Sequence, residues 1–369
     1  MEKYISERVK AIDASGIRKV FALAADLKDP VNLSIGQPDF DVPEEIKEKA
    51  IQAIKDGFNK YSQTAGDAEL LAKIKKVVER ETGWQNPQVL VASGVSGGLM
   101  LAFMAMINPG DEVIIPDPYF VIYKHIVKML GGKCVFIDTY PDFRLPTGKI
   151  KKAITDKTKL IIVNSPCNPT GIVYTENELK ELAELADKKQ IPVLSDEIYD
   201  KFCYDGNCPS IAKFYRNTIL LKGFSKAYGM PGWRLGYLAV GQHLKNLLEQ
   251  MLKIQQYTFV CAPTPFQKAA IAALDVDVSK YIEQYKIKRD IIYQGLCKKF
   301  EFKKPQGAFY AFIKAPNERA TEFVEKAIKN NVLIIPGNVF SEKDTHFRIS
   351  YATSNDKLQQ GIEILRSLV

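Results

Sequence analysis

Short apolar runs alternate with amphipathic segments over the first two-thirds of the chain. Between about residues 44 and 273, runs rich in β-branched residues are separated by segments with helical spacing of apolar positions, of which 176–189 is the clearest. The pattern predicts seven strands, at 88–92, 112–116, 133–137, 160–164, 192–195, 218–222 and 236–240. Because these strands are apolar throughout and alternate with helices, we expect an α/β fold with a mainly parallel sheet and helices on both faces.

The pattern changes after residue 273. It predicts a long helix at 281–300, a turn into a strand at 307–312, a helix at 318–330, strands at 332–335 and 347–351, and a final helix at 355–368. These elements indicate a smaller α+β unit, against which the first 45 residues are expected to pack. Because 369 residues exceed the usual size of one core, we predict a large domain at 46–282 and a small domain made of 1–45 and 283–369.

Composition and charge exclude several classes of function. The net charge of +8 is small for 369 residues, and lysine and glutamate are mixed along the chain, which argues against a nucleic-acid surface. Three histidines and six cysteines without a CxxC pair predict no metal site. Cysteines that remain free thiols would place the protein in the reducing cytoplasm.

One uncharged stretch approaches the length of a membrane span. Residues 89–107 carry no charge over nineteen positions, but glycines and serines interrupt the stretch at 93–98. A buried strand, a glycine turn and a buried helix account for it better, and the N-terminus has no apolar signal core. We therefore expect a cytoplasmic protein that does not interact with a membrane.

Polar residues follow three of the predicted strands. Asn168 lies in a proline-rich turn after the fourth strand, Asp196 directly follows the fifth, and Lys226 follows the sixth. Taken singly, each has an ordinary interpretation as a turn residue or a surface charge. Because ligands bind beyond the carboxyl ends of parallel strands, we expect the three to lie near one site.

The combination fits one ligand, pyridoxal phosphate. Its aldehyde requires a lysine amine, its ring nitrogen a carboxylate, its phenolic oxygen hydrogen-bond donors, and its phosphate an arginine with backbone amides at a helix start. Arg234 follows Lys226 closely, and the glycine turn at 94–98 precedes the apolar helix. Neither GxxxxGK(S/T) nor GxGxxG occurs, so the sequence does not indicate a nucleotide loop.

Eight segments together carry a more specific resemblance. They are LSIGQPDFDVP (33–43), KYSQTAGDAEL (60–70), NPGDEVIIPDPYF (108–120), NSPCNPTG (164–171), SDEIYD (195–200), FSKAYGMPGWRLGY (224–237), GAFYAF (307–312) and FRISYAT (347–353). In this order, they make the chain resemble the fold-type I pyridoxal-phosphate-dependent aminotransferases of class I/II, the aspartate aminotransferase superfamily. The resemblance covers essentially the whole chain.

The resemblance implies roles at the cofactor for the matching residues. Lys226 would bind the aldehyde covalently and then move the proton at the substrate Cα. Asp196 would pair with the ring nitrogen, and Asn168 and Tyr199 would hydrogen-bond the phenolic oxygen. Lys226, Asp196 and Tyr199 are thus the predicted catalytic residues. The remaining cofactor contacts would come from Ser225, from Arg234 and the backbone amides of Val95 and Ser96 at the phosphate, and from Phe120 stacked on the ring.

Other matching residues imply how the substrate is held and how subunits meet. Arg348 would bind the substrate α-carboxylate in a bidentate pair, with Asn168 beside it and Gly36 approaching through its backbone. Tyr61 matches a tyrosine that reaches the phosphate of the partner subunit, which predicts a homodimer. Tyr257 is a second candidate for contact across that interface.

The implied reaction transfers an amino group from an L-amino acid to a 2-oxo acid such as 2-oxoglutarate, by a ping-pong mechanism. Ser96 stands where aspartate-preferring relatives have lysine, and Ile17 where they have threonine, so we expect aromatic or other apolar donors more than aspartate. Arg18 would either meet a distal carboxylate or be a surface charge. Gly223 replaces a serine that many relatives carry three residues before the lysine.

Two other functions are compatible with this scaffold. A carbon–sulfur β-lyase would use the same core residues and would form pyruvate and ammonia from cystathionine without a 2-oxo acid. A regulatory protein would retain the fold without catalysis, but Lys226, Asp196 and Arg348 are all present. We therefore expect an enzyme, and a transaminase in preference to a lyase.

Overall fold

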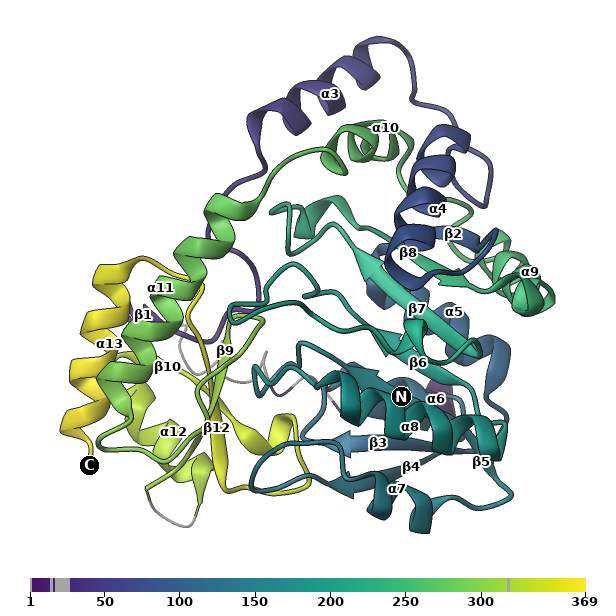
Figure 1. Cartoon of the computed structure of the whole chain (residues 1–369). Coiled ribbons are helices and arrows are strands. Elements are labelled where there is room, and N and C mark those ends of the chain that lie inside the picture. Colours follow the sequence, from purple (N-terminus) through teal and green to yellow (C-terminus); the bar gives the residue numbers. More distant parts are fainter. Residues whose placement is uncertain (1, 14–15, 17–26, 317–318) are drawn as a thin grey trace.

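The computed structural model describes residues 2–13, 16, 27–316 and 319–369. A large lobe built around one sheet lies beside a smaller lobe that contains the C-terminus (Figure 1). Ile17, which stands where aspartate-preferring relatives have threonine, and Arg18, the candidate partner of a distal carboxylate, lie outside the described residues.

The large lobe contains a seven-stranded sheet in the order β2-β8-β7-β6-β5-β3-β4. The strands are β2 (Gln88–Ser93), β3 (Glu112–Asp117), β4 (Lys133–Asp138), β5 (Thr158–Asn164), β6 (Val193–Asp196), β7 (Thr218–Gly223) and β8 (Leu235–Val240). β8 runs antiparallel to both of its neighbours, β2 and β7, whereas the other pairs of this sheet are parallel. The prediction of a mainly parallel sheet is confirmed, and each predicted strand matches within two residues at either end.

Helices cover both faces of this sheet because successive residues of each strand point to opposite sides. Leu221 of β7 packs in the core that contains α5, whereas its neighbour Leu220 packs in the core that contains α4 and α10. Ile161 and Val163 of β5 pack with α8. The helices of this lobe are α3 (Glu44–Lys55), α4 (Ala68–Thr82), α5 (Gly94–Met106), α6 (Ile122–Met129), α7 (Thr147–Ala153), α8 (Glu176–Lys189), α9 (Lys245–Gln256) and α10 (Thr264–Ala273).

The apolar helix α5 begins earlier than the sequence suggested. The predicted glycine turn at 94–98 is wrong, because Gly94 to Gly98 form the first turns of α5 itself. A Cβ on Gly98 would lie 2.6 Å from Leu221, so glycine allows the helix to pack directly on β7. Among the described residues, no helix is long and apolar enough to cross a membrane. The cytoplasmic location stays a prediction.

The small lobe combines a segment near residue 31 with the C-terminal part of the chain. Its elements are β1 (Val31–Asn32), α11 (Ser279–Leu296), β9 (Tyr310–Lys314), α12 (Ala320–Lys329), β10 (Val332–Leu333), β11 (Ile335–Pro336), β12 (His346–Ser350) and α13 (Asn355–Ser367). β11, β12 and β9 form an antiparallel sheet, and β1 pairs with β10 in parallel. The segment predicted as one strand at 332–335 is therefore two short strands that join different sheets.

Several short helices complete the described structure. They are α1 (Glu7–Lys10) and the 3₁₀ helices η1 (Glu2–Tyr4), η2 (Ile211–Lys213), η3 (Pro231–Trp233), η4 (Gln242–Leu244) and η5 (Gly337–Val339).

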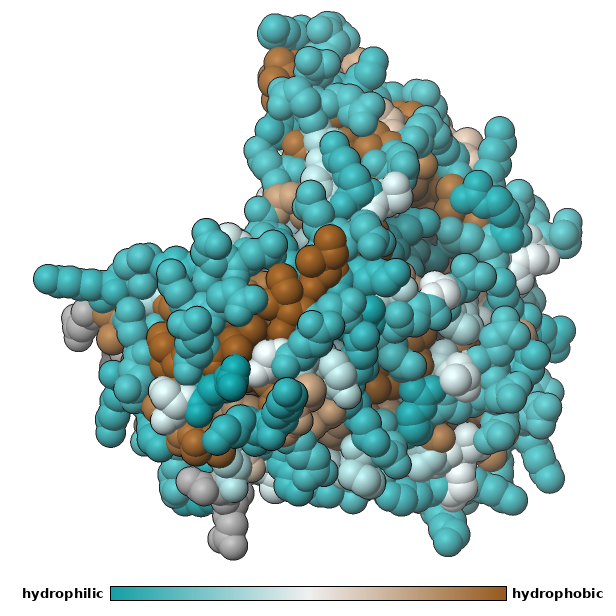
Figure 2. Space-filling view, turned by 60° about the vertical axis from the view of Figure 1, so that its left-hand side comes forward, coloured by the Kyte–Doolittle hydropathy of each residue, from teal (hydrophilic) through white to brown (hydrophobic). Residues whose placement is uncertain are grey.

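α11 spans the predicted domain boundary between residues 282 and 283, so one helix connects the two lobes. Figure 2 shows a mostly hydrophilic face with one prominent band of hydrophobic residues and smaller hydrophobic patches elsewhere.

Two cysteines differ from the prediction of free thiols. Cys203 and Cys208 form a disulfide across a short loop after β6, with Cα atoms 5.9 Å apart. The loop folds back on itself, which a sequence separation of five residues does not reveal. The remaining cysteines, Cys134, Cys167, Cys261 and Cys297, are free. The cysteine pattern therefore gives less support to a reducing compartment than the sequence suggested.

Candidate active site

A cavity of about 500 Å³ lies where β5, β6 and β7 end. Its walls also include the start of α5 and residues of β9 and β12, so both lobes contribute. Predicted site residues from distant parts of the chain line it together, namely Gly36, Val95, Ser96, Phe120, Asn168, Asp196, Tyr199, Ser225, Lys226, Arg234 and Arg348. Tyr61 does not line the cavity of its own chain, and its side chain is 83% exposed.

Lys226 lies in the turn that follows β7, and its Nζ donates a hydrogen bond to the carbonyl oxygen of Gly36 at 2.6 Å. Burial, reinforced by the positive charges of Arg348 and Arg234 and opposed by Asp196, lowers the pKa of this amine from 10.5 to about 8. A substantial fraction of Lys226 is therefore neutral near physiological pH. Only the neutral amine is a nucleophile or a base.

Asp196 is the last residue of β6 and is 2% exposed. Its carboxylate accepts a 2.6 Å hydrogen bond from the Tyr123 hydroxyl and a 3.2 Å bond from the backbone N–H of Ile198. Burial raises the pKa of Asp196 to about 6, although both hydrogen bonds and Lys226 oppose this shift. A buried carboxylate of this kind favours a cationic partner inside the cavity. Tyr123 was not predicted, because an aromatic residue on an apolar face of α6 is typical of a core.

Arg348 comes from the middle of β12 and is 1% exposed. One guanidinium nitrogen donates to Oδ1 of Asn168 at 3.0 Å, and another to the carbonyl oxygen of Ser34 at 2.7 Å. Its Nε is buried without a hydrogen-bond partner among the described residues. The rings of Tyr310 and Phe340 lie on the guanidinium at 4.5 and 4.4 Å. A buried arginine with unused donor capacity is suited to a carboxylate.

The start of α5 and Arg234 together have the features of an anion site. The first N–H groups of a helix have no partner inside the helix, and the Ser93 side chain does not cap them. A Cβ on Gly94 would lie 2.8 Å from the Arg234 guanidinium, and a Cβ on Gly236 would lie 2.8 Å from the Gly94 backbone. Glycine at both positions therefore allows the Arg234 guanidinium, the strand β8 and the start of α5 to approach one another closely. The helix dipole also favours a negative charge at the start of α5.

Gly223, where many relatives carry serine, lies in a crowded part of the sheet. A Cβ there would come 2.9 Å from Ile198, 3.2 Å from Val95 and 3.3 Å from the carbonyl oxygen of Leu235. A serine would therefore require these neighbours to move. The packing around Gly223 accounts for the absence of a side chain at this position.

Comparisons with known proteins agree with this geometry. The family model for aminotransferase class I and II matches residues 28–365. The chain is 41% identical over 374 residues to a probable aspartate aminotransferase of Methanocaldococcus jannaschii, covering 99% of each chain. It is 34% identical to aromatic-amino-acid aminotransferase 2 of Thermococcus litoralis, covering 99% and 98%. The Thermus thermophilus aspartate aminotransferase with maleate matches with a TM-score of 0.93, at 33% identity and 99% coverage of each chain.

The chain belongs to aminotransferase class I and II. It is an amino acid aminotransferase that depends on pyridoxal phosphate, as members of this class do. The cavity fits that cofactor chemically. It combines a partly neutral lysine, a buried carboxylate and an anion site at a helix start, which match an aldehyde, a ring nitrogen and a phosphate.

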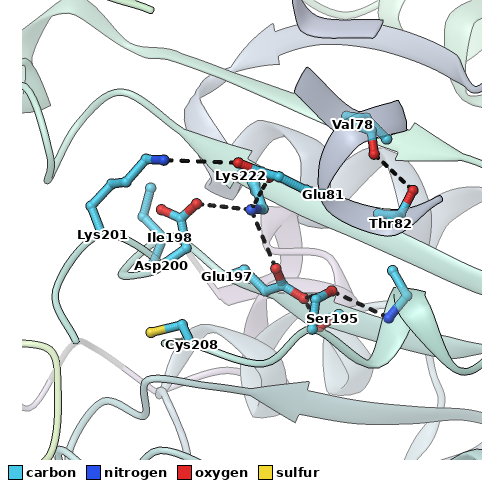
Figure 3. A network of polar contacts seen from close by, with 12 residues as sticks. Val78, Glu81, Thr82, Ser195, Glu197, Ile198, Asp200, Lys201, Cys208 and Lys222 are labelled. Carbon is cyan, nitrogen blue, oxygen red and sulfur yellow. Dashed lines mark hydrogen bonds and ion pairs between the residues drawn. The ribbon is translucent and has the colours of Figure 1, made fainter. Parts of the chain in front are cut away.

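A buried ion network holds the turn from which Asp196 and Tyr199 enter the aminotransferase cavity. Figure 3 shows Lys222 of β7 among three carboxylates. Its Nζ lies 2.7 Å from Glu81, 2.8 Å from Asp200 and 3.5 Å from Glu197. The hydroxyl groups of Ser195 and Ser210 also donate to Glu197. Because side chains alternate along β7, Lys222 points to the face covered by α4, away from α5.

The charges in this network depend on one another. Burial alone would lower the pKa of Lys222, but Asp200, Glu197 and Glu81 together raise it well above its ordinary value. Burial raises the pKa of Glu197, and Lys222 is the strongest influence in the opposite direction. Lys222 therefore balances the negative charges of Glu197, which follows Asp196 in the chain, and of Asp200, which follows Tyr199. In the sequence pattern, Lys222 is only the last residue of a predicted strand.

We predict that Lys222→Met destabilises the protein by about 3–5 kcal/mol, because it leaves buried carboxylates without a cation. Lys201→Met is the matched control, since Lys201 is 42% exposed and, among the described residues, forms an ion pair with Glu81 alone, at 3.8 Å. The control should cost less than about 1 kcal/mol. Urea unfolding of both variants measures the difference, and equal losses would contradict the role given to Lys222.

Proposed function

We propose that this cavity is the catalytic site and that it holds pyridoxal phosphate through the contacts predicted from the sequence. Lys226 bonds to the aldehyde, and Asp196 holds the ring nitrogen in its protonated form. Tyr199 and Asn168 donate hydrogen bonds to the phenolic oxygen. The Asn168 side-chain amide is available for this because its Oδ1 already accepts from Arg348. The observation that carries the proposal is that Lys226, Asp196 and Arg348 line one cavity.

The remaining cofactor contacts follow from the anion site and the cavity wall. Arg234 and the backbone amides of Val95 and Ser96 bind the phosphate, with Ser225 beside it. Phe120 lies against the ring. This arrangement is supported by the close approach of Arg234 to the start of α5.

The proposed mechanism relies on a proton moved by Lys226. When bound, pyridoxal phosphate supplies an aldehyde that bonds to amines and a ring that withdraws electrons from the amino acid Cα. Arg348 holds the substrate α-carboxylate, with Gly36 and Asn168 beside it. Lys226, as a neutral amine, would take the proton from the substrate Cα and pass it to the cofactor carbon that bore the aldehyde. In the second half of the reaction the same amine would move a proton in the opposite direction, to the Cα of the 2-oxo acid. Asp196, as a carboxylate, would keep the ring nitrogen protonated, so that the ring can accept electrons from Cα.

For substrates, we propose aromatic or other apolar L-amino acids as donors and 2-oxoglutarate as acceptor. The relatives named for aspartate and for aromatic amino acids both match over nearly the full chain. Among the described residues lining the cavity, the cations are Lys226, Arg234 and Arg348, and each already has a proposed partner. A second substrate carboxylate would therefore find uncharged groups such as Gln37 and Ser96 in the described part of the wall. This favours donors without a side-chain charge, and the second carboxylate of 2-oxoglutarate would bind through hydrogen bonds to such uncharged groups.

We predict that L-phenylalanine and L-tyrosine exceed L-aspartate in kcat/KM by roughly tenfold or more, with 2-oxoglutarate as acceptor. Ser96→Lys should raise kcat/KM for aspartate, because it adds a cation to the cavity wall. A donor-by-acceptor panel monitored through the cofactor absorbance measures both effects. Aspartate as the preferred donor of the unmodified chain would overturn the substrate proposal, and pyruvate formed from cystathionine without an acceptor would identify a lyase.

The pKa of Lys226 predicts how the apo-enzyme takes up its cofactor. Below pH 8 the amine is mostly protonated, so covalent capture of pyridoxal phosphate should accelerate as pH rises, with a midpoint near 8. Arg348→Met removes a positive charge that lowers this pKa and should move the midpoint upward. Stopped-flow absorbance measures the rates. A midpoint near 10 in the unmodified chain would contradict the proposed environment of Lys226.

We also propose that the active unit is a homodimer to which Tyr61 contributes across the interface. Tyr61 and Tyr257 are 83% and 82% exposed, which is unusual for large aromatic side chains on a free surface. Tyr61 lies six residues beyond α3. Further exposed hydrophobic side chains on and just after α3 are Ile51, Ile54 and Phe58. A second copy of the chain would cover this surface.

Mixed dimers test the contribution of Tyr61. We expect Tyr61→Ala and Lys226→Ala to be weak or inactive alone at limiting pyridoxal phosphate. After subunit exchange, mixed dimers should regain about a quarter of wild-type activity, because half of the dimers are mixed and each contains one intact site. The absence of any gain, in a sample whose subunits have exchanged by mass spectrometry, would argue that each chain uses its own Tyr61.

A further inference from the structure

Tyr310 is a buried tyrosine between two residues with separate proposed roles. It is the first residue of β9 and is 1% exposed, and it lines the cavity. The segment 307–312 carries part of the family resemblance, but no role for Tyr310 follows from it. A Cβ on Gly36 would lie 2.8 Å from its hydroxyl, so the hydroxyl lies against the backbone of Gly36. Gly36 is also the residue whose carbonyl oxygen accepts from Lys226.

The hydroxyl group of Tyr310 contacts that of Tyr199. The two oxygens are 2.8 Å apart, and the rings meet edge to face with centroids 5.7 Å apart. Either hydroxyl can donate in this pair. If Tyr199 uses its only proton toward the phenolic oxygen of the cofactor, Tyr310 must be the donor to Tyr199. A hydroxyl that accepts a hydrogen bond becomes a stronger donor, so Tyr310 strengthens the bond that Tyr199 makes.

The ring of Tyr310 contacts Arg348. β9 and β12 are antiparallel, with Tyr310 opposite Ser350, so Arg348 is its diagonal neighbour on the same face. The guanidinium carbon lies 4.5 Å from the ring centroid. Phe340 covers the guanidinium at 4.4 Å as well. Two rings therefore restrict how Arg348 can turn, while its Nε remains without a partner among the described residues.

We propose that Tyr310 is a positioning residue with two separable tasks. Its hydroxyl holds the Tyr199 hydroxyl as a donor toward the phenolic oxygen of the cofactor, and its ring supports the Arg348 guanidinium at the substrate carboxylate. This inference rests on the proposed function, because it acts through the roles given to Tyr199 and Arg348. One side chain thus links the cofactor end of the cavity to the substrate end.

The two tasks reside in different atoms, so two variants separate them. Tyr310→Phe removes the hydroxyl and keeps the ring on Arg348. Tyr310→Leu removes both. Phe323→Leu is the control for lost aromatic packing, because Phe323 is equally buried in the small lobe but packs on Phe347 instead of lining the cavity.

The hydroxyl task is read from the cofactor absorption band in the absence of substrate. A hydrogen-bond donor to the phenolic oxygen stabilises the deprotonated form of the bound cofactor. Losing that donor therefore raises the pH at which half of the bound cofactor is deprotonated, which is the midpoint of the pH-dependent change in the absorption band. Tyr199→Phe should therefore raise the midpoint, and Tyr310→Phe should raise it by roughly a tenth to a third as much. In the double variant, Tyr310→Phe should add nothing, because its effect passes through the Tyr199 hydroxyl.

The ring task is read from the KM for 2-oxoglutarate. Tyr310→Leu should raise this KM by roughly 3- to 30-fold, the range expected for loss of a desolvated cation–π contact. Tyr310→Phe should leave it within about twofold, because the ring remains. Phe323→Leu should lower the thermal unfolding temperature without moving the KM or the midpoint of the band.

The outcomes distinguish this inference from the proposed function. If Tyr199→Phe leaves the midpoint unchanged, the proposed contact of Tyr199 with the cofactor fails, and the hydroxyl task of Tyr310 fails with it. If Tyr199→Phe raises the midpoint and Tyr310→Phe does not, only the hydroxyl task is overturned. An unchanged KM in Tyr310→Leu overturns the ring task. If Phe323→Leu changes the midpoint of the band and the KM for 2-oxoglutarate as much as the Tyr310 variants do, the effects arise from general packing and the inference is wrong.

Discussion

The parallel course of β5, β6 and β7 is the constraint on which the site depends. The three strands are adjacent and end at one edge, so Asn164, Asp196 and the turn to Lys226 meet without any long connection. A chain that changed the register of β6 by one residue would turn Asp196 toward the opposite face of the sheet. The small lobe then completes the cavity by bringing β9 and β12 over this edge.

This arrangement buries polar and charged groups, which costs free energy of folding unless each group has a partner. Nearby hydrogen bonds and ion pairs offset that cost. Asp196 is satisfied by Tyr123 and a backbone N–H, whereas the neighbouring acids Glu197 and Asp200 share Lys222 on the other face of the sheet. The turn between β6 and the Cys203–Cys208 loop is thus held from both sides. That rigidity keeps Asp196 and Tyr199 directed into one cavity.

The fold was largely predictable because continuous apolar strands and amphipathic helices leave a strong periodic signal. Prediction failed where local pattern and tertiary pairing differ, as at Ile334, which separates two strands that join different sheets. Motif resemblance found many of the residues that line the cavity. It missed Tyr123, Lys222 and Tyr310, because each resembles a core or strand residue until the elements that it contacts are known. Tertiary contacts, not sequence spacing, assign them to the site.

The central claim is that Lys226 is the amine that binds the cofactor at this strand edge. Borohydride reduction of the protein loaded with pyridoxal phosphate fixes the covalent bond, and peptide mass spectrometry then locates the modified lysine. We predict one modified position, Lys226, and loss of this modification in Lys226→Ala. Modification of a different lysine, or equal incorporation into Lys226→Ala, would contradict the account.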